Sequence, residues 1–417
     1  MGAIREQAER LWSGATSEVF SPQAAFWGLE TYQPGLGFVA AFANVVAIDS
    51  DEGLVLIDVS SPIAGPRVRE VVRASLSTRP VHTVVYTHGH IDHTLGLHAF
   101  LNEERPAGAP PLRVIAHANV PLRFDRYKRS AGYNGHINAR QFRIPGLVWP
   151  TFFRYPDEVY TATRTLRIGG EELVLYHARG ETDDHTFVHL PARRALCTGD
   201  LFIWASPNCG NPQKAQRYAF EWAQALRQMQ ALGCELLLPG HGPPIEGRER
   251  VHEALGDTAA LLESLHDQTL ALMNEGAPLD VILQKVRAPA ELLQRPYLRP
   301  IYDEPEFIVR NIWRGYGGWW DGNPANLKPA AEDRLAAEVA ALAGGAPALI
   351  DRARALSEQG EHALACHLAE WAARAAADDA AVRELRAAIY RRRADAQTSL
   401  MARSLYLAAA EEPVKKP

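Results

Sequence analysis

The chain contains 417 residues with a formal net charge of −5, and 47% of the residues are hydrophobic and 22% charged. This length exceeds what one hydrophobic core usually supports, so about two or three domains are expected. The lack of a basic excess argues against nucleic acid as a partner. No apolar run approaches the roughly 18 residues of a membrane span, and the charged first residues do not resemble a signal peptide. Four cysteines without CxxC spacing suit free thiols, so we expect a cytoplasmic protein.

Short strands and helices are expected to alternate through the first 250 residues. Apolar runs bounded by turn residues predict strands at 43–48, 54–59, 81–86, 112–116, 172–176, 186–190, 195–197 and 235–238. Helices are expected between them, at 68–76, 95–101 and 218–232. Because polar residues gather where these strands end, the pattern predicts an α/β layered catalytic domain over residues 1–250.

Helical composition takes over after residue 250. We expect a helical linker and interface region over 251–330, followed by an all-α domain over 331–417 that is rich in Ala, Leu, Arg and Glu. Apolar residues at helical spacing on both sides of Gly360 indicate a helix hairpin similar to tetratricopeptide-type repeats, and a plain helical bundle fits equally well. The expected role of this region is association or shaping of the site entrance.

The most informative segment is Thr-His-Gly-His-Ile-Asp-His at 87–93, directly after an expected strand. Imidazole nitrogens and a carboxylate crowded at a strand end suit a borderline-soft divalent cation such as zinc. His88 and His90 can reach one ion, while Asp92 and His93 point to a second. Two ions about 3.5–4 Å apart can generate a hydroxide nucleophile at neutral pH. The alternative is a surface loop that is histidine-rich by chance.

The spacing His-x-His-x-Asp-His after a strand resembles the signature of the metallo-β-lactamase fold, an αββα sandwich. The matching segments that follow are Arg-Gly-Glu-Thr with Glu181, Cys-Thr-Gly-Asp with Asp200, and Pro-Gly-His-Gly with His241. Glu181 stands where most members of that family have histidine, an exchange that resembles the alkylsulfatases. Residues 315–329 also look like the stretch that opens the alkylsulfatase helical dimerisation domain.

The resemblance implies a ligand set of His88, His90 and Glu181 on one zinc, Asp92, His93 and His241 on the other, and Asp200 as the bridge. Asp183, Asp184 and His185 are rival ligands to Glu181, and His185 could instead orient a ligand. Two zinc ions carry four positive charges, which three carboxylates and a hydroxide would cancel. An anionic substrate must then find its positive charge in nearby Arg or Lys side chains.

Polar and cationic residues that could hold a sulfate follow the expected bridging aspartate in the loop-like stretch 202–218. They are Asn208, Asn211, Lys214 and Arg217. The alternative for the two cations is the solvated start of the helix expected at 218–232. A second candidate anion binder is Arg140 in the stretch 133–141, which faintly resembles an alkylsulfatase motif and is otherwise an ordinary polar loop.

Several aromatic residues in the interface region could line a pocket for an alkyl chain, although a domain-interface core is the favoured interpretation. They and one arginine are Tyr297, Tyr302, Arg310, Trp313, Trp319 and Trp320.

Taken with the resemblance, the sequence predicts a zinc-dependent hydrolase that cleaves alkyl sulfate esters to alcohol and sulfate through a metal-bound hydroxide. Asp92 and Asp200 would be its catalytic carboxylates, and His185 or Tyr218 could serve as general acid. We expect a small anionic ester as substrate and a homodimer through the C-terminal helices. The alternatives are a hydrolase of another ester, lactone or phosphodiester on the same metals, or a non-catalytic helical interaction protein.

Overall fold

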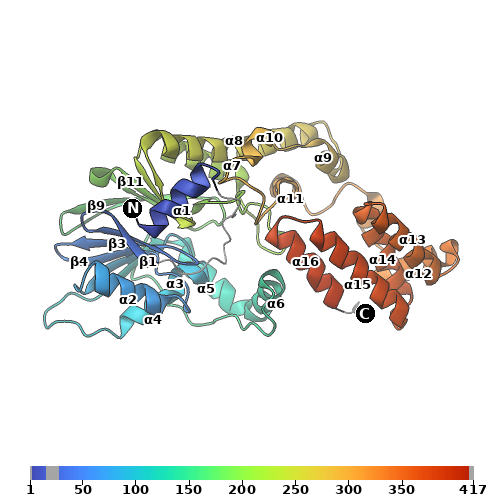
Figure 1. The fold of residues 1–417 in the computed structure, drawn as a ribbon, viewed down its shortest axis with the longest axis horizontal. Helices are drawn as coiled ribbons and strands as arrows, with labels where there is room; N and C mark the ends of the chain where they lie inside the picture. The colour runs from blue at the N-terminus through green and yellow to red at the C-terminus, as the bar shows by residue number, and fades with distance from the viewer. Residues whose placement is uncertain (1, 16–27, 413–417) are drawn as a thin grey trace. The chain divides into compact units, whose positions relative to one another are not determined.

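The computed structural model describes residues 2–15 and 28–412. The chain packs as two compact units, shown in Figure 1. The first unit consists of Met1–Ala131, Trp149–Ala277 and Val281–Gly318, and the second of Gly132–Val148, Pro278–Asp280 and Trp319–Pro417. The domain boundaries expected at residues 250 and 330 stay predictions.

Two β-sheets form the centre of the first unit. The seven-stranded sheet has the order β1 (Gly28–Gln33), β2 (Leu36–Ala40), β3 (Val45–Ser50), β4 (Gly53–Ile57), β5 (Val81–Val85), β6 (Arg113–His117) and β7 (Glu158–Tyr160). The six-stranded sheet has the order β13 (Ile245–Glu246), β12 (Leu236–His241), β11 (Ala195–Ile203), β10 (His185–Leu190), β9 (Glu171–Ala178) and β8 (Thr163–Ile168). Strands β4 to β7 run parallel, as do β11 and β12, and the other neighbours are antiparallel. The loop after β5 meets Asp200, which lies within β11, and His241, which ends β12.

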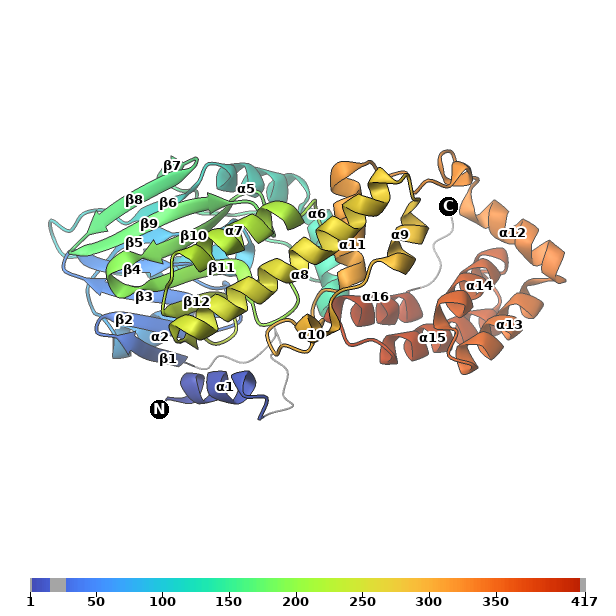
Figure 2. The same ribbon diagram turned by 90° about the horizontal axis from the view of Figure 1, so that it is seen from above.

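Helices cover the outer faces of both sheets. On the seven-stranded sheet these are α2 (Gly65–Ser75), η1 (Leu95–Leu97), α4 (His98–Leu101) and α5 (Asn119–Arg129), and the short α3 (Ile91–Thr94) precedes η1. On the six-stranded sheet they are α7 (Ala219–Ala231), α8 (Arg248–Asn274) and α11 (Pro305–Tyr316), and Figure 2 shows α7 and α8 lying along it. The remaining elements of this part of the chain are α1 (Ala3–Trp12), η2 (Pro191–Arg193), α9 (Leu279–Lys285) and α10 (Ala290–Leu293).

The alternation of side chains along each strand builds three hydrophobic layers. On β2, Phe38 belongs to the core between the sheets, while its neighbour Val39 packs under the outer helices. On β12, Leu238 faces the other sheet and Leu237 faces α7 and α8. This is the four-layer αββα sandwich that the sequence predicted.

The second unit is helical. Its elements are α6 (Ala131–Phe142), η3 (Pro324–Asn326), α12 (Glu332–Ala343), α13 (Ala346–Glu358), α14 (His362–Ala375), α15 (Ala380–Asp395) and α16 (Leu400–Glu411). Fully buried alanines such as Ala353, Ala365 and Ala369 let α13 and α14 approach closely, and Gly360 turns between them with a positive φ of 85°. The all-α prediction is confirmed. Within residues 2–15 and 28–412, no helix has the length and hydropathy needed to cross a bilayer.

Candidate metal centre

The buried carboxylate of Asp58, just after β4, holds the histidine-rich loop that follows β5. It accepts hydrogen bonds from the backbone N–H and the hydroxyl of Thr87, each at 2.7 Å, and from Nδ1 of His93, also at 2.7 Å. Asp58 adopts a positive φ of 58°, a strained conformation for a residue with a side chain. Asp58 was not predicted as a site residue, although it lies in the strand expected at 54–59.

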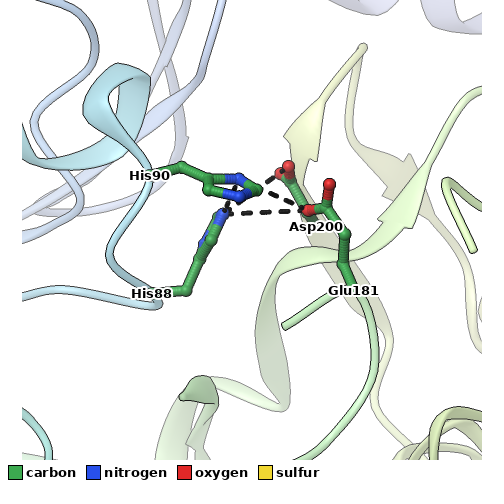
Figure 3. A group of neighbouring side chains, drawn as sticks. All are labelled: His88, His90, Glu181 and Asp200. Atoms are coloured by element: carbon green, nitrogen blue, oxygen red, sulfur yellow. Dashed lines mark hydrogen bonds and ion pairs between the residues drawn. The ribbon is translucent and has the colours of Figure 1, made fainter. Parts of the chain in front are cut away.

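The first candidate ligand group consists of His88, His90, Glu181 and Asp200 (Figure 3). Nδ1 of His88 donates to the Thr87 hydroxyl at 3.0 Å, which leaves Nε2 as the ligating atom. That Nε2 lies 2.8 Å from Nδ1 of His90 and 3.8 Å from the nearest oxygens of Glu181 and Asp200. Four donor atoms therefore face one small volume.

The second candidate group consists of Asp92, His93 and His241. Nδ1 of His241 donates to the Phe42 carbonyl, so its Nε2 faces inward, 3.7 Å from Asp92. Asp200 reaches this group as well, because its two oxygens lie 3.2 Å from His93 Nε2 and 3.4 Å from His241 Nε2. The structure thus brings all seven expected ligands together, with Asp200 between the two groups.

Unsatisfied polar atoms test whether these residues suit a metal. Nε2 of His93, Oε2 of Glu181 and Oδ1 of Asp200 are buried and, within the described residues, have no hydrogen-bond partner. Burying such atoms without a partner costs free energy. Nitrogen and oxygen donors without a thiolate suit zinc and similar divalent ions. The residues present therefore fit a metal centre.

Burial and charge set the ionisation of the two central carboxylates. Burial raises the pKa of Glu181 to about 7, against the opposing effect of Arg217. Burial also works against ionisation of Asp200, but the facing His241 and His93 hold its pKa well below the usual value. Asp200 is therefore the firmly anionic group at the centre of the site.

The rival ligands have other partners. Asp184 accepts from the Gly89 amide at 3.0 Å and from Arg123 at 2.8 Å, and Asp183 pairs with the same guanidinium. Nε2 of His185 accepts from the Asp200 amide at 3.1 Å, and its ring stacks on His88. These three residues hold the 87–93 loop and its ligands in position. Glu181 is therefore the side chain of the 181–185 segment that faces the first ligand group.

The expected substrate residues occupy different surroundings. Asn208 donates to Oε1 of Glu181, and Nη1 of Arg217 lies 2.5 Å from the same oxygen. Asn211 is buried and accepts from the Gln213 amide at 3.0 Å. Nζ of Lys214 lies 5.7 Å from the centre of the Trp149 ring. Burial, followed by the nearby Arg217, lowers the pKa of Lys214 to about 7.

Arg140 belongs to the second unit, on α6 rather than in the polar loop that the sequence suggested. Its guanidinium lies 3.4 Å from the Glu412 carboxylate, and the neighbouring Arg143 pairs with Glu411. Both ion pairs are partly exposed. The anion-binding role expected for Arg140 stays a prediction.

Helix α11 and the segment before it support the loop that follows β11, a role that was not predicted from the sequence. Asp303 accepts from the Gly210 amide at 2.5 Å, and Asn311 hydrogen-bonds both the N–H and the carbonyl of Arg217. Burial raises the pKa of Tyr302, followed by the effects of Glu181 and Asp92. Tyr297 lies instead in the hydrophobic core.

Two family models match the chain. Residues 39–241 match the metallo-beta-lactamase superfamily, and residues 279–415 match the alkyl sulfatase dimerisation model. The chain is an alkylsulfatase-like member of the metallo-β-lactamase superfamily. The predicted resemblance is thereby confirmed.

Curated alkylsulfatases are similar to this chain in sequence. The linear primary-alkylsulfatase of Pseudomonas sp. (strain ATCC 19151) is 28% identical over 88% of this chain and 73% of its own length. The (R)-specific secondary-alkylsulfatase of Pseudomonas sp. is 28% identical over 78% of this chain, which spans only 53% of that relative. A solved stereoselective inverting sec-alkylsulfatase from Pseudomonas sp. superposes with a TM-score of 0.84 at 23% identity, covering 98% of this chain and 70% of the other. This last likeness confirms the fold.

Proposed function

We propose that this alkylsulfatase-like protein hydrolyses alkyl sulfate esters to an alcohol and sulfate with two zinc ions. The observation that carries the proposal is the meeting of Glu181 with His88 and His90 in one buried group beside Asp200. In sequence, a glutamate at this position resembles the alkylsulfatases. The match of residues 279–415 to the alkyl sulfatase dimerisation model supports the same assignment independently.

The chain's own residues would hold and orient the reacting groups. His88, His90 and Glu181 would take one ion and Asp92, His93 and His241 the other, with Asp200 between them. Bound ions of this kind supply an activated water and Lewis acidity toward the ester oxygens. The Asp58 carboxylate would keep the His93 ring in the tautomer that presents Nε2 to its ion.

The sulfate needs a positive charge outside the metals, and Lys214 is the leading group for this role. Its ammonium interacts electrostatically with both Glu181 and Asp92, one from each ligand group. Tyr302 interacts electrostatically with the same two carboxylates, and its hydroxyl is a second candidate hydrogen-bond donor to the sulfate. Asn211 would hold the Lys214 backbone through its carbonyl, which accepts from the Lys214 amide at 3.2 Å.

We further propose that the protein acts as a cytoplasmic homodimer. The dimerisation-type match supports association of two copies, and the four cysteines are all free thiols. Light scattering on the full chain tests the oligomeric state.

A substrate panel tests the reaction. Dodecyl sulfate and 2-octyl sulfate are compared with a phosphodiester and a lactone, using protein of known metal content. Preferential sulfate release supports the proposal, whereas preferential turnover of the phosphodiester or lactone favours the alternative hydrolase. Reaction in oxygen-18 water then separates attack at carbon, which labels the alcohol, from attack at sulfur, which labels sulfate.

A further inference from the structure

The two oxygens of Glu181 have different neighbours. Oε1 receives Nη1 of Arg217 at 2.5 Å and the side-chain amide of Asn208. Oε2 lies 3.6 Å from His90 and 3.8 Å from His88, and has no hydrogen-bond partner among the described residues. One oxygen is therefore held by the protein and the other is aimed at the first metal position.

Arg217 is fixed in place from three directions. Its Nη1 also donates to the backbone carbonyl of Glu181 at 2.9 Å. Asn311 on α11 accepts from the Arg217 amide at 3.2 Å and donates to the Arg217 carbonyl at 2.9 Å. Arg217 is only 4% exposed and Asn311 only 5%. A side chain so constrained is suited to orienting a neighbour rather than to following a substrate.

The ion pair between Glu181 and Arg217 changes the net charge of the metal centre. Glu181 brings one negative charge to a position 2% exposed to solvent. A buried carboxylate is unfavourable without a paired cation, and Arg217 supplies that cation through a short, charge-assisted contact. Glu181 and Arg217 together are neutral, as a histidine ligand would be. The pair therefore leaves more positive charge for an anionic ester than Glu181 alone would.

We propose that Arg217 is a positioning residue for the metal ligand Glu181, held in place by Asn311, and that it acts on the substrate only through this ligand. The inference rests on the metal centre assigned in the proposed function but not on the identity of the ester. It also changes the expected effect of removing Arg217. A sulfate-binding arginine would alter the KM for the ester, whereas a positioning arginine alters metal affinity.

The test is a metal competition titration on metal-free full-length protein, with a chromophoric chelator and zinc. Arg217→Met is expected to weaken binding of one of the two ions by roughly 10- to 100-fold, as is typical when a partner of a metal ligand is lost. Arg217→Lys, which keeps the charge but not the planar fork, should recover part of that loss. Asn311→Ala should give a smaller loss in the same ion. Arg227→Met removes an exposed, paired arginine on α7 and should leave both affinities unchanged.

A double-mutant cycle makes the test specific. If Arg217 acts through Glu181, Arg217→Met should have little further effect on metal affinity in a Glu181→Gln background. If Arg217→Met weakens metal binding by the same factor in the wild-type and Glu181→Gln proteins, the proposal is overturned. Wild-type metal affinity in Arg217→Met with a raised KM for a sulfate ester would overturn it as well, in favour of direct sulfate binding.

Two controls distinguish a loss of metal affinity from a loss of folding. Circular dichroism of the metal-free variants establishes whether each is folded. If Arg217→Met is unfolded, the metal affinity of Arg217→Lys is compared with that of the wild-type protein instead. The visible spectrum of the cobalt-substituted protein should change in the variants, because it reports the geometry at the ligand directly. If the wild-type protein binds two ions but hydrolyses no sulfate ester, the proposed function fails while this inference stands.

Discussion

Asp58 lies 2.7 Å from Nδ1 of His93 and fixes the orientation of this ring from a strand 35 residues away in the chain. The same carboxylate holds the backbone and hydroxyl of Thr87, so it sets both the start of the metal-binding loop and its last histidine. We expect Asp58→Ala to weaken metal binding by roughly 10- to 100-fold, because His93 loses the partner that fixes its tautomer. Asp58→Asn should lose less, since an amide oxygen can still accept. Competition titration measures both, and unchanged affinity in Asp58→Ala would contradict this role.

Metal removal should destabilise the protein. Three buried ligand atoms without partners would be satisfied by bound ions, so binding should favour the folded state. At free metal about 100 times the Kd, one site adds about 2.7 kcal/mol to the free energy of unfolding. A strong chelator should therefore lower the Tm, and zinc should restore it. Equal Tm values with and without chelator would show that these residues hold no metal.

Asp303 should make stability depend on pH. Burial raises its folded-state pKa from 3.8 to about 7, so the folded protein keeps a proton that the unfolded chain releases. The stability from this group is fully present below about pH 4, falls as the pH rises, and is gone above about pH 7. Asp303→Asn keeps an acceptor for the Gly210 amide but removes the titration. The difference in urea midpoint between the two proteins should shift between about pH 4 and pH 7, and a constant difference would refute the assignment.

Lys214 should give substrate affinity its own pH dependence. Burial lowers its pKa to about 7, so its positive charge is present below that pH and lost above it. For a sulfate ester, kcat/KM should therefore fall as the pH rises through this value. Lys214→Met should reduce kcat/KM at pH 6 by roughly 10- to 100-fold, in line with the loss of a hydrogen bond to a charged group. Lys214→Arg should keep its activity to higher pH. If kcat/KM of Lys214→Met still falls over the same pH range, another group causes the pH dependence and the role of Lys214 is refuted.

The sequence predicted the core strands and the metal ligands because both signals are local. Strands β5, β11 and β12 are buried apolar runs, and four of the seven ligands lie within 88–93. Strand β8 was missed because its burial pattern leaves most of its side chains exposed, among them Arg164 and Arg167, as befits the edge of a sheet. Strand β2, which is fully buried and contains Gly37, was missed as well.

The supporting contacts could not be read from one sequence. Arg123 meets Asp184 across 61 residues and Asn311 meets Arg217 across 94, so no local pattern relates the partners. Helix α11 was expected to belong to an interface region, yet it anchors the loop that carries Asn208 and Arg217. Which of the cationic residues faces a carboxylate depends on these tertiary contacts.

The most direct measurement of the central claim is sulfate release from 2-octyl sulfate by protein that contains two zinc ions per chain. We expect equal amounts of sulfate and alcohol, loss of the reaction in chelator, and recovery when zinc is returned. Glu181→Ala should abolish the reaction. Protein with both ions bound that releases no sulfate from alkyl sulfates of any chain length would contradict the account.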